Sequence, residues 1–78
     1  MKLEIIALDK TIFSGDVSEV TVPGSKGSFQ ILPNHAPLIS TLSSGKISYE
    51  QDGVTHELAI TKGVISVSNN KIMILDRS

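Results

Sequence analysis

The sequence predicts an all-β domain, a flattened β-sandwich or barrel of about ten short, mainly antiparallel strands. Isoleucine (10), valine (6) and threonine (5) supply 21 of the 78 residues, whereas alanine supplies 3. β-Branched side chains pack well on a pleated surface and lose rotamer freedom in a helix. Six glycines and three prolines interrupt the chain at short intervals, and no long apolar stripe of helical period lies between them.

Length and charge narrow the class further. A chain of 78 residues forms one small domain, residues 1–78, with a single core. The net charge of −1 argues against a nucleic-acid-binding protein, because such proteins carry a basic patch. The absence of cysteine excludes disulfides, iron–sulfur clusters and thiolate zinc sites, and two histidines are too few for a histidine-only metal site. Apolar runs are shorter than a secretory signal (about 7–15 residues) or a membrane span (about 20), so we expect a soluble, intracellular domain. We also expect no cofactor.

The first part of the chain predicts two strands before residue 17. Lys2–Leu8 alternates at first, and then Ile6 and Leu8 add apolar side chains to the second face, so we expect the far end of this strand to be covered on both sides. Thr11–Phe13 is predicted as a short strand and Ser14–Asp16 as a turn.

The next segment contains a strand, a turn and a stiff loop. Val17–Val22 alternates well and stops at Pro23, because proline cannot donate to a strand ladder. Gly24–Gly27 is a turn and Phe29–Leu32 a brief strand. Pro33–Pro37 is a compact loop, since each proline fixes its own φ near about −65° and restricts the residue before it. A stiff exposed loop is a candidate contact surface.

The second half predicts a series of hairpins. Asp52-Gly53 indicates a type I′ turn, and Asn69-Asn70 a second tight turn, because asparagine tolerates left-handed φ. Lys62-Gly63 bends the chain between them. Ile72–Leu75 is apolar on both faces and predicts a central strand covered on both sides. The alternation assigns these side chains to the core: Leu3, Ile5, Val20, Val22, Phe29, Ile31, Leu42, Ile47, Leu58, Ile60, Val67, Ile72 and Ile74.

No pattern of side chains predicts catalysis. The serines lack a Gly-x-Ser-x-Gly motif, and no pair of carboxylates is singled out for acid–base chemistry. Gly45-Lys46 lacks the preceding glycine and the following Ser or Thr of a phosphate-binding loop. His35 has two compatible readings: its imidazole bonds the loop backbone and holds the loop shut, or it contacts a partner. His56 lies on a strand and is expected at the edge of the core or in solvent.

The alternative to an interaction module is a lipoyl- or biotin-carrier domain, which is also a flattened β domain of about this length. Asp9-Lys10 faintly resembles the lipoyl dipeptide, and Lys10 would then carry the prosthetic group. However, Lys10 lies too close to the start of the chain, because too few strand residues precede its hairpin.

Residues 27–38 carry a resemblance to a known family. They read Gly-Ser-Phe-Gln-Ile-Leu-Pro-Asn-His-Ala-Pro-Leu and resemble the Gly-x-x-Gly-Ile-x-Pro-Gly-His-Ala-Pro-Leu of the epsilon subunit of the rotary F-type ATP synthase. Similar elements flank this run, and the resemblance spans the chain. Gln30 and Asn34 stand where the family usually has glycine, and Asn34 keeps access to positive φ. Ser28 stands where some members have an acidic residue.

The resemblance implies a noncatalytic rotor subunit in the central stalk of a proton-translocating synthase. Such a subunit binds the gamma subunit and the loops of the membrane c-ring, and it transmits torque for ATP synthesis. It would be peripheral on the cytoplasmic side of the bacterial inner (plasma) membrane, or on the equivalent side of an energy-transducing organelle membrane. By this resemblance the contacts with gamma and the c-ring fall on Ser28, His35, Ala36, Pro37, Leu38, Ser40 and Thr41, and Gly24, Gly27, Pro33 and Asn34 shape the loops.

Members of this family usually continue into two C-terminal helices, which in many cases can inhibit ATP hydrolysis. This sequence stops at Asp76-Arg77-Ser78. From these 78 residues we therefore expect neither helical inhibition nor ATP binding.

Overall fold

The computed structural model describes residues 1–77 and divides them into nine strands. Ser78, the last residue of the predicted domain, lies outside the described residues. The strands are β1 (Lys2–Ala7), β2 (Lys10–Asp16), β3 (Glu19–Val22), β4 (Phe29–Ile31), β5 (Leu38–Leu42), β6 (Gly45–Gln51), β7 (Val54–Ile60), β8 (Gly63–Ser68) and β9 (Lys71–Asp76).

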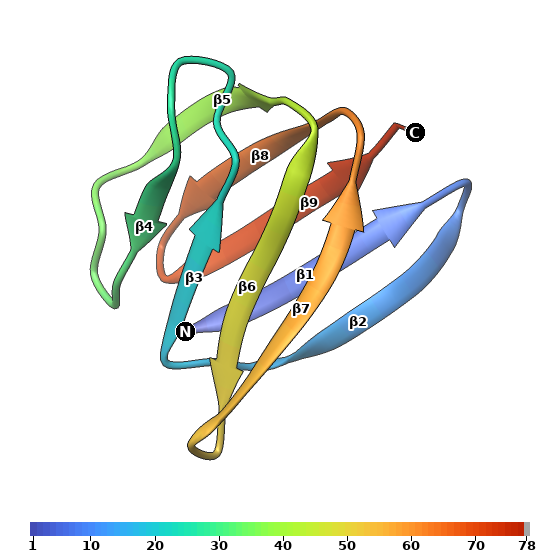
Figure 1. Ribbon diagram of the computed structural model, residues 1–78. Coiled ribbons are helices and arrows are strands. Elements are labelled where there is room, and N and C mark those ends of the chain that lie inside the picture. Colours follow the sequence, from blue (N-terminus) through green and yellow to red (C-terminus); the bar gives the residue numbers. More distant parts are fainter. Residues whose placement is uncertain (78) are drawn as a thin grey trace.

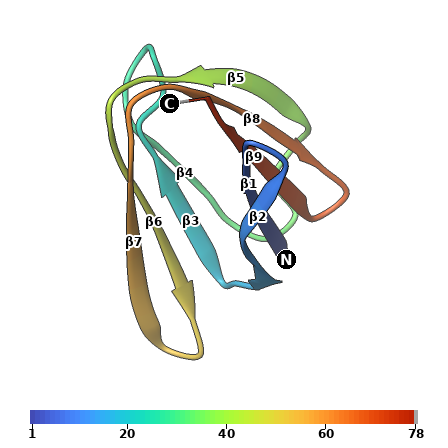
Figure 2. The ribbon, with the colours of Figure 1, turned by 90° about the vertical axis from the view of Figure 1, so that its right-hand side faces the viewer.

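The strands form two layers (Figures 1 and 2). One sheet has the order β2-β1-β9-β8-β5 and the other the order β4-β3-β6-β7. Strands β1 and β9 pair in parallel, and the remaining neighbours pair antiparallel. The predicted class, an all-β sandwich of short and mainly antiparallel strands, is confirmed. Residues 1–77 contain no helix that is long and apolar enough to cross a membrane.

The core lies between the two sheets and takes alternate residues from each strand. Eleven of the thirteen predicted core side chains are buried there. Phe29 and Leu58 are half-buried and pack against the core from its edge. The prediction missed two buried residues, Val17 and Ile65. Val17 precedes β3, where its N–H donates to the carbonyl of Met1 at 2.8 Å, so a residue outside the strands closes one end of the core.

The expectation that some strands are covered on both sides is wrong. Strand β9 is central in its sheet, between β1 and β8, but the side chains of Met73 and Leu75 are each 39% exposed. Leu8 is 90% exposed, because it lies in the turn between β1 and β2. A two-layer sandwich leaves the outer face of each sheet without a covering layer, so a strand can be central and still have one face in solvent.

The first hairpin is longer than the sequence predicts. Strand β2 continues through Ser14–Asp16, the segment predicted as a turn, and Gly15 pairs with Leu3 of β1. The chain turns toward β3 only after Asp16, at Val17 and Ser18, and the turn of the first hairpin falls at Leu8 and Asp9, with φ of 48° and 62°. Glycine and serine at the end of β2 look like turn residues in sequence, but their pairing with β1 keeps them in the ladder.

The other predicted hairpin turns are confirmed. Asp52 and Gly53 have φ of 52° and 77°, and Asn69 and Asn70 have φ of 51° and 59°. Two consecutive residues at positive φ are what a type I′ turn requires, since its twist matches that of the flanking strands.

Candidate partner interface

The Pro33–Pro37 loop passes from one sheet to the other. It leaves β4, the edge strand of the four-stranded sheet, and enters β5, the edge strand of the five-stranded sheet. Its side chains are exposed apart from that of His35, which is half-buried. The loop therefore forms part of the side of the sandwich where these two edges meet (Figure 1).

His35 holds this loop in a tight conformation. Its N–H donates to the carbonyl of Leu32 at 3.2 Å, and its ring Nδ1 lies 2.7 Å from the carbonyl oxygen of Ala36. A carbonyl oxygen only accepts, so Nδ1 carries the hydrogen in this contact. The reading in which the imidazole bonds the loop backbone is thus confirmed. The second reading, a contact with a partner, stays a prediction.

Asn34 joins the loop to a distant part of the chain. Its N–H donates to Oδ1 of Asn70 at 2.5 Å, and Nδ2 of Asn70 donates back to Oδ1 of Asn34 at 2.8 Å. Asn34 has a φ of 66°, as expected for a residue that replaces glycine at a tight turn. From its place in the sequence, Asn70 is predicted only as part of a hairpin turn. No local signal links it to a residue 36 positions away.

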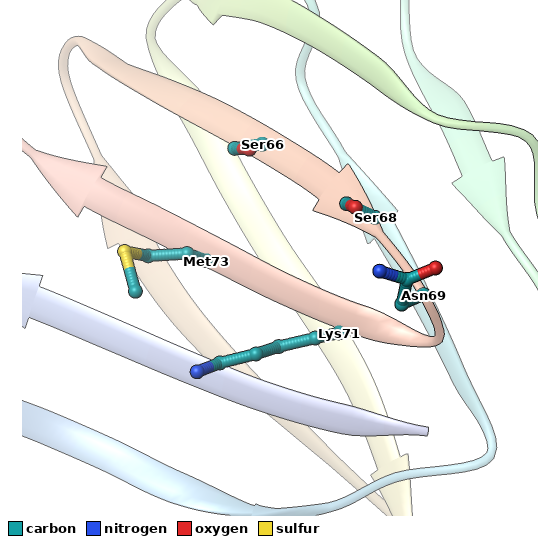
Figure 3. A pocket seen from close by; sticks show the side chains of 5 residues that line it. All are labelled: Ser66, Ser68, Asn69, Lys71 and Met73. Atoms are coloured by element: carbon teal, nitrogen blue, oxygen red, sulfur yellow. The ribbon is translucent and has the colours of Figure 1, made fainter.

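The loop and the β8–β9 turn enclose an open hollow of about 430 Å³. Its lining consists of Asn34, His35, Ala36, Pro37, Asn69 and Asn70. Asn69 also borders a second hollow on the outer face of the five-stranded sheet (Figure 3). That second hollow is lined further by Ser66 and Ser68 of β8 and by Lys71 and Met73 of β9. The hollow beside the loop therefore adjoins a second hollow on the outer face of this sheet, and Asn69 lines both.

Of the remaining predicted contact residues, Ser28 lies between β3 and β4, and Leu38, Ser40 and Thr41 lie in β5. Oγ1 of Thr41 donates to Oγ of Ser25 at 2.8 Å, and the N–H of Ser25 donates to the carbonyl of Thr41 at 3.1 Å. Ser28 is exposed at the end of the turn between β3 and β4, and Ser40 is half-buried in β5. Leu38 is half-buried at the start of β5 and packs against the core. The structure thus brings His35, Ala36 and Pro37 together in one hollow and places Ser28, Ser40 and Thr41 outside it.

Two glycines shape the β3–β4 turn in different ways. A Cβ on Gly24 would lie 2.6 Å from the carbonyl oxygen of Gly27 and 2.7 Å from the ring of Phe29, so close packing excludes a side chain there. Gly27 has a φ of 126°, which L-amino acids rarely adopt, although the space around it is open.

Within residues 1–77, no group of three or more His, Asp and Glu side chains could hold a metal ion. His56 stacks on Tyr49 with ring centroids 5.3 Å apart, which is a packing contact. Lys10 is exposed directly after the Leu8-Asp9 turn.

The geometry defines a class: a small two-sheet β-sandwich in which the exposed Pro33–Pro37 loop joins the edge strands of both sheets. Comparison with known proteins then gives the family. A model of the beta-sandwich domain of the ATP synthase delta/epsilon chain matches residues 1–78, and this chain belongs to that family. The resemblance in residues 27–38 is therefore confirmed over the whole chain, and the carrier-domain alternative with a modified Lys10 is not favoured.

Individual relatives agree with this family. The chain is 44% identical to an ATP synthase epsilon chain of Lawsonia intracellularis over 75 residues, which cover 96% of this chain and 56% of the relative. It is 40% identical to that of Pelotomaculum thermopropionicum over 74 residues, 95% of this chain and 55% of the relative. The chain thus spans little more than half the length of the curated relatives it matches.

Solved structures support the same fold. A chain from the Euglena gracilis mitochondrial ATP synthase, in an assembly of OSCP, F1 and c-ring, superposes with a TM-score of 0.91 at 20% identity and covers 97% of this chain and 49% of that chain. A chain from the Tetrahymena thermophila mitochondrial ATP synthase, in a structure of the central stalk and c-ring, superposes with a TM-score of 0.83 at 17% identity. That match covers 99% of this chain and 63% of that chain.

Proposed function

We propose that this domain is a noncatalytic rotor component in the central stalk of a proton-translocating F-type ATP synthase. In this role it links the gamma subunit to the loops of the c-ring and carries torque between them during ATP synthesis. The observation that supports this most strongly is the match of all 78 residues to the delta/epsilon beta-sandwich family. The protein would be held at the membrane through the complex, on the cytoplasmic side in a bacterium or on the equivalent side in an organelle.

The architecture suits a mechanical role. Torque passes through a contact without loss only if the contact does not yield, and loops yield more easily than sheets. Here both sheets share one buried core, and the exposed Pro33–Pro37 loop is fixed by two prolines and by the hydrogen bonds of His35. The domain therefore offers a firm surface at the place where the loop is exposed.

The proposed contact surface has two parts. The loop part comprises His35, Ala36, Pro37 and Leu38, and the turn part comprises Ser28, Ser40 and Thr41. Gly24, Gly27, Pro33 and Asn34 set the backbone of these segments. Leu38 of the first part and Ser40 and Thr41 of the second part lie in β5, so a partner that reaches along this edge strand would contact both parts.

The test is assembly of the natural full-length subunit that carries His35→Ala and Pro37→Gly. The double variant loosens the loop, so we expect it to co-purify less with gamma and the c-ring and to lower ATP-driven proton pumping. A matched control carries His56→Ala and Asp52→Gly, which remove one imidazole and introduce one glycine near β7, the sheet edge opposite β4. Unchanged assembly and pumping in the first variant would contradict the proposed role of the loop.

A further inference from the structure

The contact between Asn34 and Asn70 is reciprocal. Each residue donates one hydrogen bond to the other and accepts one from it, through the backbone N–H of Asn34 and the two side-chain amides. Both residues have positive φ, 66° and 59°, a conformation that glycine adopts more easily. The asparagine side chains therefore do more than permit the backbone conformation: they connect two turns.

The two connected turns differ in how firmly they are attached to the sandwich. The β8–β9 turn closes a hairpin in the five-stranded sheet, and the carbonyl of Asn70 also accepts the N–H of Lys2 at 2.9 Å. The Pro33–Pro37 loop spans the gap between the two sheets, and His35 supplies its internal hydrogen bonds. Figure 1 shows the loop after β4 and the turn between β8 and β9 on the same side of the molecule. The contact thus fixes the less supported segment to the better supported one.

We infer that Asn34 and Asn70 form a clasp that positions the Pro33–Pro37 loop for partner binding. The clasp acts one residue before His35, at the tip of the loop. It therefore fixes the positions of His35, Ala36 and Pro37, which line the hollow. Asn70 is a positioning residue in this scheme and has no required contact with the partner. The inference rests on the proposed function, because it assumes that the loop is a contact surface.

A loop that is held in its bound position loses less conformational entropy on binding than a mobile one. Opening the clasp should therefore weaken binding even when the overall stability of the sandwich is unchanged. Asn70→Gly removes both hydrogen bonds and keeps the positive φ, so it opens the clasp without backbone strain. Asn34→Asp is the conservative variant, since its carboxylate still accepts from Nδ2 of Asn70 and its N–H remains.

The first measurement is amide hydrogen exchange at Asn34, whose N–H donates to Oδ1 of Asn70. The net free energy of one hydrogen bond predicts that Asn70→Gly speeds this exchange roughly five- to tenfold. Asn69→Gly makes the same change at the neighbouring turn residue and should alter the exchange less than about twofold, because the side chain of Asn69 does not bond Asn34. An unchanged rate in Asn70→Gly would overturn the clasp.

The second measurement is the affinity of the full-length subunit for ATP synthase that has been stripped of it, with the midpoint of thermal unfolding recorded in parallel. We expect Asn70→Gly to weaken binding roughly tenfold, while the domain stays folded and the midpoint falls by only a few degrees. Asn34→Asp should retain most of the affinity of the parent, and Asp52→Gly, a glycine substitution at positive φ in a distant hairpin, should leave the affinity unchanged.

The outcomes separate this inference from the proposed function. If Asn70→Gly speeds amide exchange at Asn34 but does not lower the affinity, the positioning role is wrong. The proposed function would still stand in that case, provided that the His35→Ala, Pro37→Gly variant fails to assemble. If that double variant also assembled normally, the proposed contact surface itself would be wrong.

Discussion

Leu3 of β1 lies opposite Ile72 of β9 in parallel register, and both side chains are fully buried. This pair joins the start of the chain to its end in the middle of the five-stranded sheet, because β1 and β9 are neighbours there. The sheet cannot be completed until residues about 70 positions apart have met. The fold thus depends on long-range pairing, which favours slow, cooperative folding.

The core contribution of β9 can be tested by truncating one residue on each face of the strand. Ile72→Ala leaves a cavity beside Leu3 and should lower the free energy of unfolding by about 2–5 kcal/mol. Met73→Ala, on the exposed face of the same strand, should cost less than about 1 kcal/mol because its side chain is partly solvated already. Urea denaturation of both variants measures the difference, and equal losses would contradict the assignment of the two faces.

A second prediction concerns the close packing at Gly24. Gly24→Ala places a methyl group against the carbonyl of Gly27 and the ring of Phe29, so one of these groups has to move. We expect a loss of about 1–3 kcal/mol in the free energy of unfolding, the usual range for overpacking. Ser25→Ala is the control at the exposed neighbouring position, and thermal unfolding of the two variants is the measurement. A Gly24→Ala variant as stable as the parent would show that the turn adapts freely.

A third prediction concerns Leu8, which has a φ of 48° and is 90% exposed. Leucine has no compensating interaction in the left-handed region, whereas asparagine tolerates it. Leu8→Asn should therefore raise the free energy of unfolding by about 0.5–1 kcal/mol. Leu32→Asn replaces another exposed leucine, which does not have a positive φ, and should not raise the free energy of unfolding. Chemical denaturation distinguishes them, and a destabilised Leu8→Asn variant would contradict the strain argument.

A fourth prediction distinguishes the effect of the His35 hydrogen bond from the effect of the size of its side chain. His35→Ala removes the contact with the carbonyl of Ala36, and amide exchange at positions 34–36 should rise roughly fivefold. His35→Asn places an amide donor near the position of Nδ1 and should recover most of the protection. Amide exchange measured by NMR on the isolated variants tests this prediction. Equal exchange in the alanine and asparagine variants would mean that the donor is not what holds the loop.

Much of this architecture could be predicted from the sequence because its causes are local. Strict alternation in β3 and β6 identified their buried faces, and the Asp52-Gly53 and Asn69-Asn70 pairs identified two hairpin turns. The errors came where a local pattern was ambiguous. Gly15 reads as a turn residue, yet pairing with Leu3 keeps it in a strand, and the exposed faces of Met73 and Leu75 depend on how many layers cover the sheet.

By itself the sequence determined the all-β class, the alternation that builds the core, and the motif in residues 27–38 that led to the family. These features are carried by the preferences of single residues and their immediate neighbours. Only the tertiary structure decided that Asn34 meets Asn70, that β1 lies beside β9, and that some of the proposed contact residues line the hollow while others lie outside it. Such relations arise when distant segments pack together, and side-chain periodicity fixes which residues share a face without fixing what that face will meet.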